Sequence, residues 1–371
     1  MNPELRRTPL WEAHRAAGAR LVEFAGWEMP VQYRGINEEQ QAVRNRAGVF
    51  DVSHMGKVLL EGSGALRFLQ HLLPPDLGRL GVGRIAYAVM CAPDGGALDD
   101  LLVYRVGQTA YLLVVNASRL DDDLNWISCQ AGAFQGVGID GSQELSGILA
   151  VQGPLAETIV GGLFGHRPLE LDYLECAQLE WSGTPLMISR SGYTGEDGFE
   201  LICPNPALAQ LWGELVALGA QPCGLGARDV LRTEMGYCLY GHELGTKLSP
   251  LDAGLAWSVD LGKEPAFVGQ HSLRRQQEAG LKQRLVGLRL EEQGIPRPGC
   301  RLLDGQGLTV GTISSGTYSP SLERGIALAY VAPSVRRPGT DLWVDLRGRS
   351  RRAVVVRTPF VPSRIKRKGR K

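Results

Sequence analysis

The chain has 371 residues, of which 44% are hydrophobic and 21% are charged. This composition is typical of a folded globular protein and excludes a disordered chain, and the length suggests about two or three domains. The formal net charge is +1, but six of the last eight residues are Lys or Arg, so the rest of the chain is mildly acidic. No apolar run reaches the roughly 20 residues of a membrane helix, and no secretory signal is apparent.

The predicted elements of the first part alternate between helix and strand. They are a helix over 8–17 with Thr8 as N-cap, a strand over 21–24, a turn at 26–30, a helix over 37–46 with Asn37 and Gln40 as a capping box, strands over 49–52 and 57–60, and a helix from 63 to about 73. The clearest pattern comes next, because three strands (86–92, 97–106 and 110–117) flank the hairpin turn Asp94-Gly95-Gly96 and a second turn.

The remaining elements change in character near residue 280. Helices are predicted over 119–130, from 154, over 206–218 and over 228–237, with strands over 145–152, 186–190 and 199–203. From 284 onward only strand-like runs remain, spaced by Gly and Pro, which indicates a separate small β-barrel or sandwich. We expect one region over 1–280, a β-domain over 281–362 and a basic tail over 363–371. A frayed, solvated tail is favoured over a polyanion-binding one.

Generic motifs of catalysis are largely missing from the sequence. There is no Walker phosphate loop, HExxH, GxSxG or zinc-like cluster, and the glycines Gly136, Gly138 and Gly141 form a GxGxxG string in the wrong context. His54 is equally consistent with a structural and a functional role. The seven cysteines are scattered, with no CxxC pair, which indicates reduced thiols and a cytoplasmic protein.

Two features point to a site. Asp99 and Asp100 lie inside an apolar strand, where carboxylates are costly unless they are paired or solvated. Strand alternation puts Asp100 and Tyr104 on one face and Asp99 on the other, so at least one carboxylate faces what the sheet buries. A β-bulge or a cap of the nearby hairpin explains the pair equally well.

The second feature is the loop from Arg190 to Glu200, which combines three glycines, Tyr193 and three acidic residues. Three acids would repel a phosphate. The loop therefore favours a neutral or amine-bearing ligand, with Glu200 accepting hydrogen bonds from an amino heterocycle.

Six strings in order then identify a family resemblance. They are Thr8-Pro9-Leu10, Phe24 to Pro30, Phe50 to Gly56, Asp99-Asp100-Leu101, Ser191 to Glu200, and Gly224 to Asp229. Over nearly the whole chain the sequence resembles the aminomethyltransferase (T-protein) family of the glycine cleavage system. The resemblance implies an α+β fold, with two interleaved α+β folate-binding domains followed by a C-terminal all-β barrel around a central channel.

The resemblance also implies a reaction and its participants. A lipoylated carrier protein (H-protein) presents an S-aminomethyl-dihydrolipoyl arm, and tetrahydrofolate takes up the one-carbon unit as 5,10-methylenetetrahydrofolate. Ammonia and the dihydrolipoyl arm are the other products. We expect no metal, flavin or nucleotide cofactor, and neither a nucleic-acid nor a membrane partner.

Residue roles follow from the same resemblance. Asp100 matches the essential aspartate near the folate nitrogens, where it either aligns the attacking nitrogen or relays a proton. Folate-lining positions are matched by Met55, Tyr87, Tyr104, Asn116, Tyr193, Glu200, Arg228 and Tyr237. Ordinary core packing is the alternative role for each aromatic. Relatives carry an aromatic residue shortly after Pro362, where this chain has Ile365, so we assign no tail residue to folate.

Three other functions fit parts of the sequence. A folate-dependent demethylase could share the scaffold, because fold does not fix the substrate. A non-catalytic folate-binding protein would carry a reactive cysteine motif that this chain lacks. Nucleic-acid binding through the basic tail would show strong salt dependence that is lost when residues 364–371 are deleted.

Overall fold

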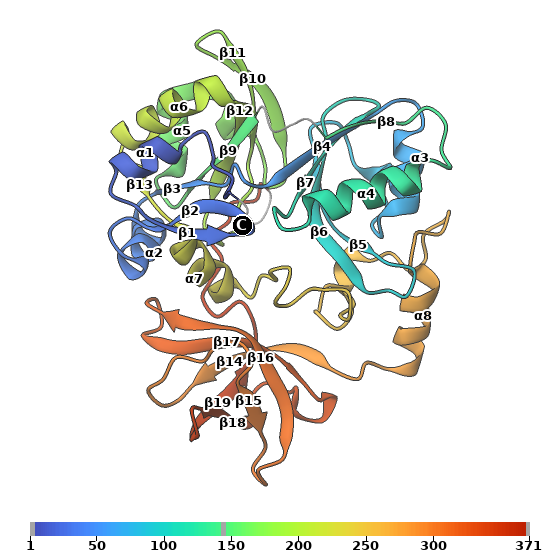
Figure 1. The fold of residues 1–371 in the computed structure, drawn as a ribbon, viewed down its shortest axis with the longest axis vertical. Helices are drawn as coiled ribbons and strands as arrows, with labels where there is room; N and C mark the ends of the chain where they lie inside the picture. The colour runs from blue at the N-terminus through green and yellow to red at the C-terminus, as the bar shows by residue number, and fades with distance from the viewer. Residues whose placement is uncertain (1–3, 142–145, 369–371) are drawn as a thin grey trace.

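The computed structural model describes residues 4–141 and 146–368. Figure 1 shows three bodies, two of them built from helices and sheet and lying side by side, and the third a barrel formed by the C-terminal part of the chain. Among the described residues, no helix has both the length and the apolar character that crossing a membrane requires. The expected α+β fold with a C-terminal β-barrel is confirmed.

A six-stranded sheet forms the first body, in the order β10-β11-β12-β9-β3-β13. Its strands are β3 (Gly48–Asp51), β9 (Ser146–Gln152), β10 (Cys176–Trp181), β11 (Thr184–Ser189), β12 (Gly198–Pro204) and β13 (Gln221–Pro222). Helices α1 (Trp11–Ala16), α5 (Ala156–Phe164) and α6 (Asn205–Ala217) belong to the same body. Apolar side chains of the sheet, such as Leu149 and Leu201, pack with Leu211 of α6 in one buried core.

A five-stranded antiparallel sheet forms the second body, in the order β5-β6-β7-β4-β8. Its strands are β4 (Gly56–Glu61), β5 (Ile85–Cys91), β6 (Ala97–Arg105), β7 (Ala110–Val115) and β8 (Gly138–Asp140). Helices α3 (Ala65–Leu72) and α4 (Leu120–Ala131) contribute to a core with one face of this sheet, where Leu101 and Val103 lie. The Gly136 to Gly141 string thus runs into a strand rather than a helix, as its context predicted.

The two bodies are interleaved in sequence. Strands β3 and β9 are neighbours in the six-stranded sheet, yet β4 to β8 all lie between them in the chain. A separate apolar cluster joins the sheets, with Phe50 and Ile148 from the first and Tyr104 and Val114 from the second. The faces of the two sheets that carry these residues therefore meet at one junction.

The C-terminal part closes into a six-stranded barrel in the order β14-β17-β16-β15-β18-β19. Its strands are β14 (Arg284–Leu290), β15 (Arg301–Leu303), β16 (Thr309–Ser319), β17 (Arg324–Val331), β18 (Asp341–Leu346) and β19 (Arg349–Val356). Alternate residues such as Leu288, Ile313 and Val344 fill the barrel core. Closure leaves the sheet without free edges. The short strand β15 is the one barrel strand that we did not predict.

Helix α7 (Leu225–Met235) links the barrel to the first body. Arg232 donates to Glu243 at 2.8 Å and to Ser315 of β16 at 2.7 Å. Glu234 forms an ion pair with Arg44 at 2.6 Å and accepts a hydrogen bond from Ser319. These groups are almost fully buried, and each charge has an opposite partner, as buried charges require.

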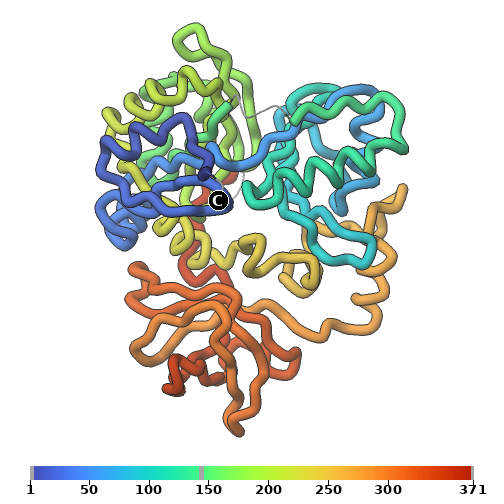
Figure 2. Tube along the Cα trace, viewed as in Figure 1, coloured from blue at the N-terminus to red at the C-terminus, as the bar shows by residue number. Residues whose placement is uncertain are grey.

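Beyond the barrel, the basic tail returns to the first body, and the expectation of a frayed tail is wrong for residues 364–368. In Figure 2 the red C-terminal segment runs from the barrel to the six-stranded sheet. The Arg364 amide donates to the Gly195 carbonyl at 2.8 Å, and the Lys368 amide donates to Asp172 at 2.8 Å. Lys366 pairs with Glu157. Acidic groups of the first body thus hold a segment whose composition alone suggests repulsion.

Several local predictions are corrected by tertiary contacts. Thr8 does not cap α1, whose N-cap is Leu10, but donates to Asp51 at 2.6 Å. Asn37 lies inside α2 (Ile36–Asn45), and Gln40 reaches Glu234 instead of closing a capping box. The turn at 26–30 is part of a hairpin of β1 (Arg20–Phe24) and β2 (Trp27–Gln32). Helix α8 (Gln270–Ala279) was not predicted.

Candidate functional site

Strand alternation brings two carboxylates to the junction between the sheets. On β6, Leu101 and Val103 enter the core shared with α3 and α4, so Asp100 and Tyr104 face the other way. On β12, Phe199 and Leu201 enter the core of the first body, so Glu200 faces the junction as well. The apolar residues that alternate with each acid along its strand therefore fix the direction in which it points.

Asp100 is half-buried and has a donor on each carboxylate oxygen. The Tyr87 hydroxyl donates to Oδ2 at 2.9 Å, and the Asn116 Nδ2 donates to Oδ1 at 2.9 Å. Burial and the neighbouring Asp99 charge raise the pKa of Asp100 to about 7. At neutral pH this carboxyl can therefore gain or lose a proton at little cost, which suits a group that handles a proton during a reaction.

Asp99 has a structural role beside it. The register between β5 and β6 shifts at Cys91 and Met90, which places a β-bulge between Ala97 and Asp99. Asp99 is fully buried and accepts both the backbone amide and the Nδ2 of Asn116, at 2.9 and 2.8 Å. The bulge that the sequence offered as one explanation of the pair is therefore present, and it leaves Asp100 facing the junction between the sheets.

Glu200 forms a second polar cluster with the glycine-rich loop. Its Oε2 accepts from the Ser191 hydroxyl at 2.5 Å. The Tyr104 hydroxyl lies beside Ser189 and Ser191, whose hydroxyls are hydrogen-bonded to each other at 2.7 Å. Tyr104 is only 2% exposed, so its ring packs in the core between the sheets and supports this cluster from behind. Among the described residues, no donor reaches the other Glu200 carboxylate oxygen, which can accept a hydrogen bond from a ligand.

Arg228 and two tyrosines lie on the loop side of the same junction. The guanidinium carbon of Arg228 lies 4.8 Å from the centre of the Tyr193 ring, and Tyr193 stacks on Tyr237 with centroids 5.6 Å apart. Among the described residues, no hydrogen-bond acceptor reaches the buried Nη1 of Arg228. Burial lowers the pKa of Arg228, although Glu200 acts in the opposite direction. This cation is placed to meet an anionic or carbonyl group of a ligand.

Tyr193 lies near both clusters, and its hydroxyl donates to the Cys238 carbonyl. Burial raises the pKa of Tyr193. Among the nearby charges, Arg232 and Arg228 lower this pKa and Asp100 raises it. The loop that carries it requires Gly195, where φ is +77° and a Cβ would lie 2.2 Å from the Met235 sulfur. No other residue fits this close approach to α7 without moving it.

Of the predicted folate-lining residues, Met55 comes first in the chain. It is half-buried at the edge of the apolar cluster between the sheets. It also lines a cavity of about 430 Å³ with Trp27, Lys57 and His54. Burial lowers the pKa of His54 to about 4, so this imidazole is neutral.

Trp257 is an addition that sequence reasoning missed. Its indole is 71% exposed and stacks on Tyr87, with ring centroids 5.4 Å apart at an interplanar angle of 27°. The indole therefore contacts the same tyrosine that donates a hydrogen bond to Asp100. The sequence offered one clue to Trp257, because an aromatic residue stands there in a segment with no helix or strand pattern.

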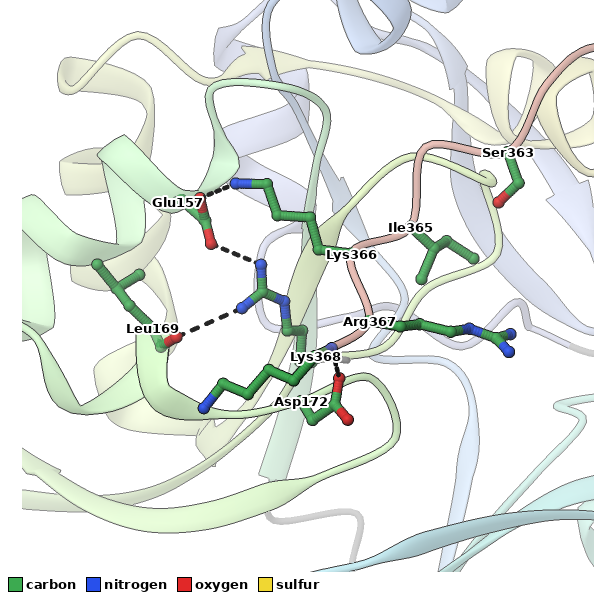
Figure 3. Close-up of a pocket in the computed structure, with 9 residues that line it drawn as sticks. Glu157, Leu169, Asp172, Ser363, Ile365, Lys366, Arg367 and Lys368 are labelled. Atoms are coloured by element: carbon green, nitrogen blue, oxygen red, sulfur yellow. Dashed lines mark hydrogen bonds and ion pairs between the residues drawn. The ribbon is translucent and has the colours of Figure 1, made fainter. Parts of the chain in front are cut away.

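The tail forms one wall of a further cavity of about 680 Å³, which is lined by both acidic and basic side chains. Arg190 and Lys366 both form ion pairs with Glu157. Figure 3 shows Lys366 pointing toward Glu157, whereas the Arg367 side chain points away from it. The Arg367 guanidinium lies 4.9 Å from the centre of the Tyr173 ring. This cavity lies on the outer side of the glycine-rich loop, whose Asp197 pairs with Arg190 at 2.6 Å.

Comparison with known proteins decides the family. Residues 10–263 match the GCVT N-terminal domain, and residues 283–362 match the glycine cleavage T-protein C-terminal barrel domain. The chain belongs to the glycine cleavage T-protein family. The resemblance that the six strings indicated is confirmed.

Related proteins agree over nearly the full length. An aminomethyltransferase of Geobacillus kaustophilus is 45% identical over 96% of this chain and 98% of its own length. One of Moorella thermoacetica is 46% identical over the same shares. The crystal structure of the glycine cleavage system aminomethyltransferase T of Bartonella henselae is 33% identical, covers 97% of this chain and 99% of its own, and superposes with a TM-score of 0.91. This T-protein family member is a transferase of one-carbon groups.

Proposed function

We propose that the chain transfers a one-carbon unit from an S-aminomethyl-dihydrolipoyl carrier protein to tetrahydrofolate. The carbon–sulfur and carbon–nitrogen bonds of the aminomethyl group break, and two bonds to folate nitrogens form. The two protons released by these nitrogens leave with ammonia and with the dihydrolipoyl thiol. The balance requires neither an oxidant nor a reductant, so the protein's task is to bind, align and move protons.

The observation that carries the proposal is a carboxyl of pKa about 7 at a junction lined by stacked aromatics. Folate is an amino heterocycle with a conjugated acidic chain. Glu200 offers an acceptor for its amino group, Tyr193 and Tyr237 offer flat surfaces, and Arg228 offers a cation. Asp100 then lies beside the reacting nitrogens, together with Tyr87 and Asn116. In this proposal Met55 and Tyr104 complete the apolar wall.

Asp100 has two related tasks in this mechanism. As a carboxylate, it stabilises the positive charge that builds on the attacking folate nitrogen, which can supply several kcal/mol of transition-state stabilisation. With a pKa about 7, it also accepts the proton that this nitrogen releases. Tyr87 and Asn116 hold the carboxylate in one orientation while this happens.

The first prediction concerns Asp100→Asn. The amide can keep the packing and part of the hydrogen bonding but can neither carry charge nor accept the proton. We expect kcat to fall by about 100-fold or more, with the Kd for tetrahydrofolate changed by less than about tenfold. The assay measures 5,10-methylenetetrahydrofolate and ammonia formed from aminomethyl-loaded carrier. A variant that keeps most of the wild-type kcat would show that Asp100 has neither task.

The second prediction concerns pH. Because burial and Asp99 raise the pKa of Asp100 above that of a free carboxyl, the ionised form is lost as pH falls through about 7. We expect kcat/KM to decrease about tenfold per pH unit below that point. Steady-state rates between pH 5.5 and 8.5 measure this limb. A rate that stays constant down to pH 5.5 would contradict a role for ionised Asp100.

Carrier dependence separates the proposal from a demethylase on the same scaffold. The aminomethyl donor enters on a lipoyl arm, so turnover should require the lipoylated carrier and stop with the unlipoylated one. Release of methylenetetrahydrofolate from a small methylated amine, with no carrier present, would favour the demethylase instead.

A further inference from the structure

Behind the Asp100 cluster lies a third carboxyl that the proposed mechanism does not use. Asp123 is in the first turn of α4 and only 1% exposed. Both of its carboxylate oxygens are buried, and no donor from the described residues reaches either of them. An ionised carboxylate in this position would lack the hydrogen bonds that buried charges need.

Within the described part of the chain, the carboxyl of Asp99 lies within hydrogen-bonding range of the Asp123 carboxyl. Two carboxylates are both acceptors, so a hydrogen bond between them exists only if one carries a proton. Asp99 accepts two hydrogen bonds from Asn116, and these stabilise its ionised form. Asp123 accepts no hydrogen bond from a side chain or amide of residues 4–141 or 146–368. The shared proton therefore belongs on Asp123.

The charges around Asp123 agree with this assignment. Arg119, at the start of α4, forms its ion pair with the exposed Asp122 at 2.5 Å and lies over the Tyr240 ring. The other facing groups are Asp122 on the same helix, Asp99 on β6 and Tyr240 after α7. Burial and the Asp99 charge raise the pKa of Asp123 to about 10, and Arg119 only partly offsets this.

We propose that Asp123 is a neutral carboxylic acid at physiological pH and a positioning residue for the active carboxyl. It donates its proton to Asp99, which keeps Asp99 ionised. The Asp99 carboxylate in turn orients Asn116, whose Nδ2 reaches Asp100 at 2.9 Å. The hydrogen bond from Asp123 to Asp99 does not depend on the proposed function. The effect of Asp123 on turnover rests on that function.

Two variants of Asp123 should affect the pKa of Asp100 differently. In Asp123→Leu the donor to Asp99 is gone, so Asp99 takes up a proton itself and loses its charge. Since that charge is one cause of the raised pKa of Asp100, the pKa of Asp100 falls. In Asp123→Asn the amide still donates to Asp99, so Asp99 stays ionised and Asp100 is unchanged.

Infrared spectroscopy of the folded, ligand-free protein tests the protonation state directly. At pH 8.5 the wild type should show the carbonyl band of a buried, protonated carboxylic acid, and Asp123→Asn should lose it. Asp122→Asn, in the exposed neighbour on the same helix, is the matched control and should keep the band. A wild type without the band, or an Asp123→Asn spectrum that retains it, would overturn the proposal even if the enzyme proved inactive.

The pH profile of kcat/KM then tests the link to Asp100. We expect the acidic limb of Asp123→Leu to move to lower pH by about one unit, and that of Asp123→Asn to match the wild type. A purely structural role would lower the rate of both variants without moving the limb, and that outcome would overturn the positioning role. If no variant transfers an aminomethyl group, the proposed function fails while the infrared result still decides the state of Asp123.

Discussion

Arg228 combines two properties that are seldom found together in a residue kept for packing. Its Nη1 is buried without an acceptor among the described residues, and burial lowers its pKa. A charged group in such surroundings is destabilising until a ligand supplies the missing acceptor. The cost in the free protein is therefore recovered on binding, when an anionic or carbonyl oxygen reaches the guanidinium.

Replacing Arg228 with Met tests this account. The variant keeps the apolar stem over Tyr193 but removes the charge, so we expect tetrahydrofolate binding to weaken by about 10- to 100-fold. Protein stability should stay equal or rise slightly, because a buried cation without a full set of partners is removed. Calorimetric titration with tetrahydrofolate and thermal unfolding measure the two effects. An unchanged Kd would place Arg228 outside the binding site.

The sequence named Asp100 together with Asp99, Tyr87 and Asn116, but it did not indicate the carboxyl of Asp123 behind them. Alternation along β6 predicts the face on which Asp100 lies, because the period of a strand is local information. Asp123 is more than twenty residues away on a helix, and Arg228 lies on α7 far along the chain. Their proximity depends on how the bodies pack. The pKa of Asp100 and the missing acceptor of Arg228 are thus properties of the folded chain.

Among the elements, the glycine-rich loop is held between α7 and the tail. Gly195 packs against Met235 on one side, and its carbonyl accepts the Arg364 amide on the other. The Ser363 hydroxyl donates to the same carbonyl at 3.3 Å, and Asp197 accepts the Lys366 amide at 3.4 Å. Backbone contacts of this kind fix the loop, and with it the ring of Tyr193.

Removal of the tail from Arg364 onward should therefore act on binding. We expect the KM for tetrahydrofolate to rise about 5- to 20-fold with a smaller change in kcat, because the loop loses order before the ligand arrives. A matched control is Lys366→Gln with Lys368→Gln, which removes two charges but keeps the backbone hydrogen bonds and should leave KM near the wild-type value. A control as impaired as the deletion would assign the effect to charge.

Prediction of elements succeeded where the signal was local. The three strands of the 86–117 meander were placed to within two residues, because their alternation and the hairpin turn at Gly95 lie in one stretch of sequence. The predictions of helix caps and of a frayed tail failed because the contacts that decide them are not local. Thr8, Gln40 and the tail lysines all use their polar groups on residues that are distant in sequence.

At the scale of the whole molecule, α7 joins the barrel to the first body through buried charge. Glu234 is fully buried and binds Arg44 from α2, Gln40 and the barrel residue Ser319. The backbone carbonyl of Glu234 also accepts the Phe360 amide at 2.8 Å. One residue thus contacts three separate parts of the chain, two of them through its side chain, and the net stability that its ion pair contributes depends on keeping all its partners.

Glu234→Ala should loosen this junction. The change leaves Arg44 with Glu196 as its one carboxylate partner among the described residues and creates a cavity beside Ser319. We therefore expect a loss of about 3–5 kcal/mol in the free energy of unfolding. Limited proteolysis should also cut the link between α8 and β14 faster than in the wild type. Glu291→Ala, on the exposed rim of the barrel, provides the comparison and should change stability by less than about 1 kcal/mol. Equal losses in the two variants would show that the junction is not specifically weakened.

The interleaved topology also sets an order of events during synthesis. The five-stranded sheet is continuous in the chain and can form as soon as β8 leaves the ribosome, since domains generally fold as units as they emerge. The six-stranded sheet must wait for β13, because β3 pairs with it across the inserted body. The last piece is the tail that holds the glycine-rich loop. A nascent chain therefore gains the contacts that hold the glycine-rich loop only after residues 363–366 have emerged, so the loop that carries Tyr193 is among the last parts of the first body to become ordered.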